Sequence, residues 1–405
     1  MSATVDALRI TEFEKGENIM SDSVEKKRLK FLHCSDIHLD NPFVGLSGEK
    51  SEERRRELRA AFMRLMEFIR ERAIDYVLIS GDLFETAFVT NTTTEILIRE
   101  FRNCPDTRFI IAPGLHDAYS SNPVYLSGRL PDNCYVFSSD SLSRFDFDED
   151  RLTVYGWAFV KDRIEVSPLY DKHIDDSSKI NIVLGYAELD GEIDSPICPI
   201  STSDLKKFGA DYYALGSRHA KTEIAKRAGY TYSYCGSLEC TGFDKPDVGG
   251  VWMVTITPGE EDSDQFAVEY KHFAFGHIRF ITEQIDITGV NANNEIINRI
   301  SRLISSRKYG IETALRVELV GDVAPDFIVP AHLECDAFGL YYFDMVDKTM
   351  PLYGTEHYMR DMSVAGEVYR RLHAMLTSEN EEDRLIAARA FRVALASLEG
   401  KETEQ

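Results

Sequence analysis

Four short apolar segments of this sequence each end in a cluster of polar side chains, and this repeated pattern constrains the fold more than any other feature. Short apolar runs bounded by glycine and polar residues are typical of buried strands. In an open α/β sheet the carboxyl ends of the parallel strands meet at one edge, where ligands bind. The predicted pairs of strand and cluster are Leu29–Cys34 with Ser35–His38, Tyr76–Ser80 with Gly81–Glu85, Phe109–Ala112 with Gly114–Asp117, and Tyr212–Leu215 with Gly216–His219.

The segments between these strands predict an α/β fold. Apolar residues recur at helical spacing through Ser47–Ala73, and a second helix is predicted around Thr93–Phe101. Strands that alternate with helices in this way indicate layers of sheet and helix around one core. Further strands are predicted at Leu152–Phe159, Ile180–Leu184, Tyr230–Tyr234 and Gly250–Ile256.

Changes in composition and in the pattern of apolar residues along the sequence predict four regions. We expect a flexible extension over residues 1–27, a main α/β domain over 28–276, a smaller cap domain over 277–350 and a helical segment over 351–405. An acidic, turn-rich stretch at Thr257–Asp264 predicts a surface hairpin within the main domain. The cap is predicted as a β-α-β unit, and the last region as two helices; the segments concerned are Ile278–Asp286, Asn294–Ser306, Ala314–Val320 and Val364–Gly400.

Composition excludes several classes of protein. The 405 residues include 68 Asp and Glu against 46 Lys and Arg, which gives a formal charge of -22. This excess of acid disfavours DNA binding by bulk charge, because non-specific binding depends on cations that contact phosphate. No run of about 18 apolar residues is present, so we expect no membrane span. Seven cysteines without a CxxC pair, and a first segment without the features of a secretory signal, lead us to expect a cytoplasmic protein.

The residue types at the predicted sheet edge are those of a metal site. Carboxylates and imidazoles together suit divalent Mn, Fe or Zn. Asp36 and His38 are two residues apart, so in an extended strand end both side chains point to the same side and reach one ion. A single Asp-x-His or Gly-Asp pair is usually a turn or a helix cap, but four such clusters in this order indicate a site.

The four clusters resemble the successive motifs of calcineurin-like metallophosphoesterases. They read FLHCSDIHLD, LISGDLFE, IAPGLHD and ALGSRH, and the segment Tyr234–Leu238 followed by Gly242–Phe243 is similar to the nuclease subunit of the bacterial SbcCD complex. The resemblance covers roughly residues 28–400. It implies a layered β-sandwich flanked by helices, a smaller α+β cap domain and C-terminal helices.

Carried over by this resemblance, one metal would be held by four residues, all of which are present. They are Asp36, His38, Asp82 and His219. The histidine that the family places against the phosphate is His116. We expect one divalent cation, Mn2+ in preference to Fe or Zn.

The resemblance implies a second metal that shares Asp82, but its other ligands are replaced. Where the family has Asn, His and His, this chain has Leu115, Tyr186 and Ser217. Leucine has no donor atom, a tyrosine hydroxyl with a pKa near 10 is normally protonated, and serine is a weak neutral ligand. The sequence therefore predicts one intact metal site and one degenerate one. Glu85, Glu188 or Asp190 as a displaced ligand is the minor alternative.

Three hypotheses for function remain open at this stage. The first is metal-dependent hydrolysis of phosphodiesters by an activated water, as in an SbcD-like DNA repair exonuclease, weakened by the loss of the second site. The second is a catalytically degenerate nuclease fold that acts as a binding or scaffold subunit with an SbcC-like ATPase partner. The third is a phosphoesterase for small substrates. We expect no membrane partner, and the resemblance is also compatible with a homodimer.

A run of arginines at Arg54–Arg56 with Arg59 has two readings. These side chains could contact a phosphate backbone, but the glutamates between them favour a solvated helix face. Trp157 and Trp252 are predicted to pack in the core.

Overall fold

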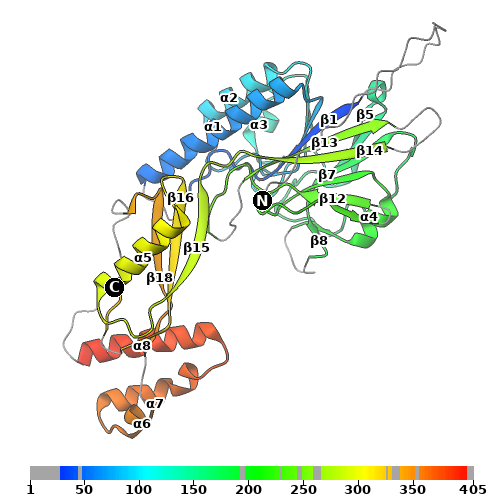
Figure 1. The fold of residues 1–405 in the computed structure, drawn as a ribbon. Coiled ribbons are helices and arrows are strands. Elements are labelled where there is room, and N and C mark those ends of the chain that lie inside the picture. The colour runs from blue at the N-terminus through cyan, green and yellow to red at the C-terminus, as the bar shows by residue number, and fades with distance from the viewer. Residues whose placement is uncertain are drawn as a thin grey trace, which may run out of the picture.

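The computed structural model describes most of the chain (Figure 1). The described residues are 28–43, 48–191, 197–227, 230–243, 249–258, 266–324, 327–330, 338–351 and 355–398. The predicted extension over residues 1–27 lies outside them. No helix of the described residues is both long and apolar enough to cross a membrane.

One large sheet carries the first three clusters. Its order is β14-β13-β1-β2-β3-β4, with β1 to β4 parallel and β13 antiparallel to both β1 and β14. The parallel strands are joined through helices, as expected for α/β connections. The elements are β1 (Leu29–Cys34), α1 (Gly48–Arg72), β2 (Tyr76–Ile79), α2 (Asn91–Arg102), β3 (Arg108–Ile111), α3 (Pro123–Leu126), β4 (Cys134–Val136), β13 (Gly250–Pro258) and β14 (Phe266–Ala274).

A second six-stranded sheet carries the fourth cluster. Its order is β11-β12-β10-β7-β6-β5, and β12, β10, β7 and β6 are parallel. The elements are β5 (Ser143–Phe147), the 3-10 turn η1 (Asp148–Asp150), β6 (Leu152–Gly156), β7 (Ile180–Tyr186), β8 (Glu188–Leu189), β9 (Pro199–Ile200), α4 (Thr202–Phe208), β10 (Tyr212–Gly216), β11 (Ala225–Arg227) and β12 (Tyr230–Tyr234). Short β8 and β9 pair with each other outside this sheet.

The two sheets pack face to face, with helices on the outside. Alternate residues of β1 point to opposite faces: Phe31 joins the core between the sheets, whereas Leu32 packs under α1 and α2. Val154 and Ile182 enter the inter-sheet core from the second sheet, whose other face is covered by α4. The predicted layered β-sandwich flanked by helices is therefore confirmed. Trp157 and Trp252 are both buried, as predicted.

Several element boundaries differ from the prediction by one to three residues. Strand β6 ends at Gly156 rather than Phe159, and β7 continues past Leu184 to Tyr186, where it pairs with Gly216. The predicted acidic hairpin corresponds to the antiparallel pair β13–β14, whose connecting residues 259–265 are outside the described part of the chain.

A smaller parallel sheet follows, in the order β15-β16-β18. Helix α5 covers one face through Ile296, Ile300 and Ile304, which recur at helical spacing. The predicted β-α-β unit is present, and the structure adds a third strand. The elements are β15 (Arg279–Asp286), α5 (Asn293–Arg307), β16 (Thr313–Val320), β17 (Asp322–Val323), β18 (Tyr342–Asp347) and β19 (Met350–Pro351).

Three helices complete the described chain, one more than predicted. Helices α6 (Thr355–Arg360), α7 (Val364–Leu376) and α8 (Glu381–Leu398) lie at the end of the small sheet that is remote from the two large sheets (Figure 1). Tyr358, Tyr369 and Phe391 form the aromatic contact between them. Arg389 donates to the backbone oxygen of Asp347, at the end of β18, at 3.0 Å.

Arg54 departs from both readings of the arginine run. Its side chain is fully buried and donates to Glu57 at 2.5 Å and to the backbone oxygen of Cys240 at 2.8 Å. The buried carboxylate of Glu239 lies 3.7 Å from its guanidinium. The guanidinium also stacks near Phe280 and Tyr341, so it joins α1 to the small sheet. This arginine therefore contributes to the fold and is not available to a ligand.

We predict that Arg54→Ala lowers the free energy of unfolding by about 3–5 kcal/mol. It removes the fully buried cation beside Glu239, whose buried carboxylate is then left with the half-exposed Arg64 at 3.4 Å and the backbone N–H of His277. Urea unfolding followed by tryptophan fluorescence measures this change. Arg56→Ala, on the exposed face of the same helix, is the matched control and should change stability by less than about 0.5 kcal/mol. Equal effects of the two substitutions would contradict the role given to Arg54.

Candidate metal centre

The loops that leave β1 and β2 are held together by backbone hydrogen bonds. Asp36 N donates to Gly81 O at 3.0 Å, and His38 N donates to Asp82 O at 2.9 Å. Asp36, His38 and Asp82 have positive φ values of 48°, 50° and 51°. Non-glycine residues rarely adopt this left-handed conformation, and it recurs at functional sites where the surrounding structure enforces it. The turn points all three side chains to one place.

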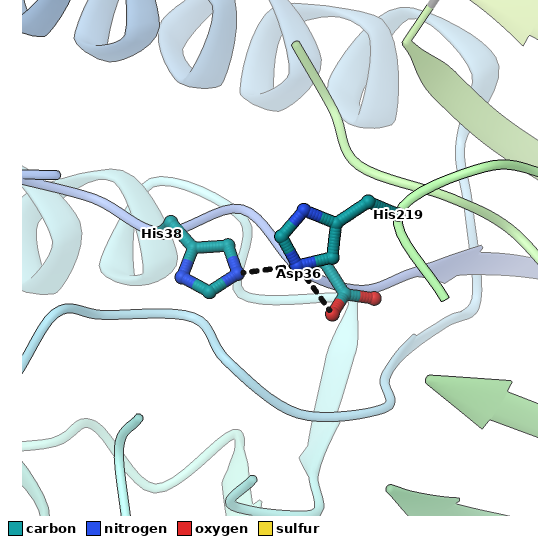
Figure 2. A group of neighbouring side chains, drawn as sticks. All are labelled: Asp36, His38 and His219. Atoms are coloured by element: carbon teal, nitrogen blue, oxygen red, sulfur yellow. Dashed lines mark hydrogen bonds and ion pairs between the residues drawn. The ribbon is translucent and has the colours of Figure 1, made fainter. Parts of the chain in front are cut away.

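Asp36, His38 and His219 form a group whose ligand atoms all lie within 4.8 Å of one another. His38 Nε2 is 3.3 Å from His219 Nε2, and His219 Nε2 is 3.7 Å from Asp36 Oδ1 (Figure 2). Asp36 and His38 follow β1, whereas His219 follows β10 of the other sheet. The group therefore forms only when the two sheets pack together.

Asp82 lies on the other side of His38. Its Oδ2 is 3.8 Å from His38 Nε2, and its Oδ1 accepts a hydrogen bond from the backbone of His116 at 2.8 Å. Burial, with the neighbouring charges of Asp117 and Asp36, raises the pKa of Asp82 to about 7, although His38 opposes the shift. Oδ2 is buried and accepts no hydrogen bond from the described residues. A buried carboxylate oxygen in this state is suited to a cation.

Glu85 contacts two histidines with its two oxygens. Oε1 is 2.8 Å from His38 Nδ1, and Oε2 is 3.0 Å from His116 Nδ1. Burial raises the pKa of Glu85, but the hydrogen bonds from both histidines outweigh it and lower the pKa to about 2. An ionised carboxylate only accepts, so both Nδ1 atoms donate. When the rings are neutral, the lone pair is therefore on Nε2, the tautomer that a metal ligand needs.

Neighbouring carboxylates raise the pKa of both histidines against the effect of burial. The hydrogen bond to Glu85 raises the pKa of His116 to about 9 against a smaller effect of burial. Burial lowers the pKa of His38, but Glu85, Asp82 and Asp36 together raise it above the ordinary value. His116 is half-exposed, with 46% of its side chain accessible, and the centre of its ring lies 5.0 Å from that of His38.

Asp117 is a supporting residue that the sequence interpretation missed. Its buried carboxylate accepts hydrogen bonds from the backbone of Gly114 at 2.6 Å and of Leu83 at 2.9 Å, and from the Tyr125 hydroxyl at 2.6 Å. It thereby fixes the loops after β2 and β3. Its place directly after His116 was the signal in the sequence, but nothing there distinguished it from a turn residue.

Of the three positions predicted to lack metal ligands, Tyr186 lies next to Asp82. The ring of Tyr186 packs on two glycines: a Cβ on Gly81 would lie 2.3 Å from Tyr186 Cδ2, and one on Gly114 would lie 2.9 Å from the same atom. Burial raises the pKa of Tyr186, and Asp82 and Asp36 raise it further, so its hydroxyl stays protonated.

Leu115 and Ser217 offer no better ligand. Leu115 packs against the same apolar cluster as Tyr186. The Ser217 hydroxyl donates to the backbone oxygen of Ala187 at 2.9 Å and so points to the protein. Of the alternative ligands weighed from the sequence, Asp190 accepts from the backbone of Thr202 at 2.9 Å, and Glu188 lies 3.9 Å from Arg218. Glu85 is the one that reaches the histidines.

The donor set fits one divalent cation. Two imidazoles and two carboxylates match the nitrogen and oxygen preference of Mn, Fe and Zn. The Nδ1–H of His38 donates to Glu85, and a histidine that binds a metal usually donates its other ring N–H to a carboxylate in this way. Two buried carboxylates, Asp36 and Asp82, place negative charge where a cation would offset it. Asp36, His38, Asp82 and His219 are therefore the residues that would hold the metal.

Comparison with known proteins identifies the class of this fold. The family profile of calcineurin-like phosphoesterases matches residues 29–220, so the chain contains a calcineurin-like metallophosphoesterase domain. This family binds divalent metals, in agreement with the candidate ligand groups.

Individual relatives extend the similarity beyond that domain. The uncharacterized metallophosphoesterase YhaO of Bacillus subtilis is 25% identical over 315 residues, which span 75% of this chain and 74% of that protein. The DNA double-strand break repair protein Mre11 of Methanopyrus kandleri is 23% identical over 228 residues, 52% of this chain and 49% of the relative. Mre11 of Thermoplasma acidophilum is 25% identical over 250 residues, 57% of this chain and 63% of the relative.

In the metal-free protein we predict that His116 titrates near pH 9, well above 6.5, because its proton is held by Glu85. The raised pKa means that this pair stabilises the metal-free fold fully below pH 6.5 and that the contribution disappears as the pH rises through 9. NMR of the imidazole signals measures the titration. Glu85→Gln should return it toward the ordinary value, whereas the exposed Glu95→Gln should leave it unchanged. Titration of His116 below pH 7 in the metal-free wild type would contradict this account.

Proposed function

We propose that this chain is a one-metal phosphodiesterase of the Mre11 and SbcD type, which hydrolyses DNA phosphodiesters far more slowly than a two-metal enzyme. The observation that carries the proposal is the asymmetry around Asp82. On one side lie Asp36, His38 and His219, and on the other Tyr186 takes the space next to its carboxylate. The Mre11 relatives support DNA as the substrate class.

The chain supplies the remaining chemistry from its own side chains. A bound divalent cation provides positive charge that polarises a phosphoryl oxygen and lowers the pKa of a water. The Nδ1–H of His116 donates to Glu85 Oε2, so Nε2 is the atom available to a phosphate oxygen. Glu85 holds the rings of His38 and His116 at once and thereby links the metal ligand to the phosphate contact. A site with only one metal has less positive charge to offset the charge that develops on the phosphate, which accounts for the slow rate.

A scaffold function is the second candidate, and the packing of Tyr186 favours it. A rigid aromatic ring beside Asp82 would be compatible with a protein that keeps the nuclease fold for binding alone.

For either function we propose an SbcC-like ATPase as partner. Ile386 and Val393 support this, because they are exposed and seven residues apart on α8, and so lie on one face.

Under this proposal the purified chain binds one Mn2+ and cleaves single- or double-stranded DNA slowly. Asp82→Asn should lower metal affinity and reduce cleavage by about 10²–10³-fold, because it removes a charged ligand. Metal content per chain and gel-based cleavage measure the two effects, and the exposed Asp140→Asn is the matched control.

The outcomes separate the candidate functions. Two Mn2+ per chain, or cleavage unaffected by Asp82→Asn, would contradict a one-metal enzyme. Manganese binding without cleavage of DNA would support the scaffold function. Cleavage of bis(p-nitrophenyl) phosphate without cleavage of DNA would support an enzyme for small substrates.

If the second site is degenerate in its ligands alone, restoring them should restore the metal. We predict that Leu115→Asn, Tyr186→His and Ser217→His together raise the manganese content from one to two per chain. Removing the Tyr186 ring also frees the space beside Asp82. Atomic emission of the dialysed protein measures the content. Unchanged metal content in a folded triple variant would count against the correspondence of these three positions.

A further inference from the structure

Arg218 is a half-exposed cation on the loop that carries a metal ligand. It stands between Ser217 and His219, after β10, and 45% of its side chain is accessible. Ser217 has a φ of 108°, a strained value for a residue with a side chain. The backbone of Ser217 donates to Asp36 Oδ2 at 3.3 Å, and its hydroxyl to Ala187 O at 2.9 Å. These contacts fix the loop and with it the position from which Arg218 projects.

The Arg218 side chain is oriented by an aromatic ring. Its guanidinium lies 4.8 Å from the centre of the Tyr234 ring. Tyr234 is itself buried and rigid, because its hydroxyl donates to Ala187 O at 3.1 Å and accepts from Leu189 N at 2.9 Å. Stacking restricts the long side chain and leaves the edges of the guanidinium, which carry its N–H donors, open to another acceptor.

The acidic neighbour of Arg218, Glu188, does not occupy the hydrogen-bond donors of its guanidinium. Glu188 Oε1 is 3.9 Å from the nearest guanidinium nitrogen, which is longer than a hydrogen bond. Both side chains are partly exposed, and such pairs are weak. Glu188 begins β8, two residues after Tyr186 at the end of β7.

We propose that Arg218 is a phosphate-binding residue that supplies part of the positive charge which a second metal would otherwise provide, an inference that rests on the proposed function. The ligand class is a phosphate monoanion or the phosphoryl oxygens of a phosphodiester, which a planar guanidinium can bind through two parallel hydrogen bonds. The phosphate is then held between Arg218 and the half-exposed His116. Glu188 competes with the phosphate for the same donors.

The test is binding of inorganic phosphate to the manganese-loaded chain, followed by the paramagnetic relaxation of its 31P signal. Arg218→Gln should weaken phosphate binding by about 10–100-fold, the loss expected for hydrogen bonds to a charged group, while the affinity for manganese is kept. Arg218→Lys should retain part of the affinity. Glu188→Gln should strengthen binding by about 2–5-fold, and this gain should vanish in the double variant with Arg218→Gln.

Arg108→Gln is the matched control. Arg108 also stacks on an aromatic ring, Tyr76, and contacts acidic side chains, but it begins β3 and so lies at the opposite edge of the sheet from the site. It should leave phosphate binding unchanged.

Three results would overturn the inference in distinguishable ways. Equal phosphate affinity of wild type and Arg218→Gln would refute the role of Arg218 and leave the proposed function intact. Loss of manganese together with phosphate in Arg218→Gln would assign this residue to folding of the His219 loop instead. A manganese-loaded wild type that does not relax the phosphate signal would overturn the proposed function, and the inference with it.

Discussion

The site depends on keeping two carboxylates, Asp36 and Asp82, buried next to each other. Charged groups of one sign in a low-dielectric interior are costly, and the cost falls when histidines, backbone N–H groups and a cation lie against them. The surrounding structure is arranged to do this. Left-handed backbone at both aspartates, hydrogen bonds between the two loops and the carboxylate of Asp117 under the turn all hold the pair in place. The buried oxygen of Asp82 that accepts no hydrogen bond from the described residues remains as the place for a cation.

The two sides of Asp82 are built from different kinds of side chain. Polar ligands come from β1 and β10, and Glu85 orients them. On the far side the Tyr186 ring lies over Gly81 and Gly114, which are close enough to it only because they have no Cβ. The metallophosphoesterase fold therefore places polar side chains on one side of Asp82 and an aromatic ring on the other.

The structure shows how several arginines of this acidic chain are used. Arginines near the site and along α1 are engaged by acidic neighbours: Arg54 is buried at the junction with the small sheet, and Arg59 pairs with the buried Asp40 at 2.9 Å. Such cations stabilise the fold. Arg218 differs from Arg54 and Arg59, because its acidic neighbour lies beyond hydrogen-bond distance.

The sequence by itself determined the strands that carry the four clusters, the layered fold and the residue types at the sheet edge, since apolar runs and the polar residues after them are local patterns. It also located Asp36, His38, Asp82, His116 and His219, because each directly follows a strand or its turn. Only the tertiary structure decided what these residues do to one another. His219 meets His38 because two sheets pack face to face, and Glu85 joins two histidines through contacts 47 and 31 residues apart in the chain. Burial of Arg54 and the support from Asp117 were likewise invisible, because long-range packing and desolvation, which no local pattern encodes, give these side chains their roles.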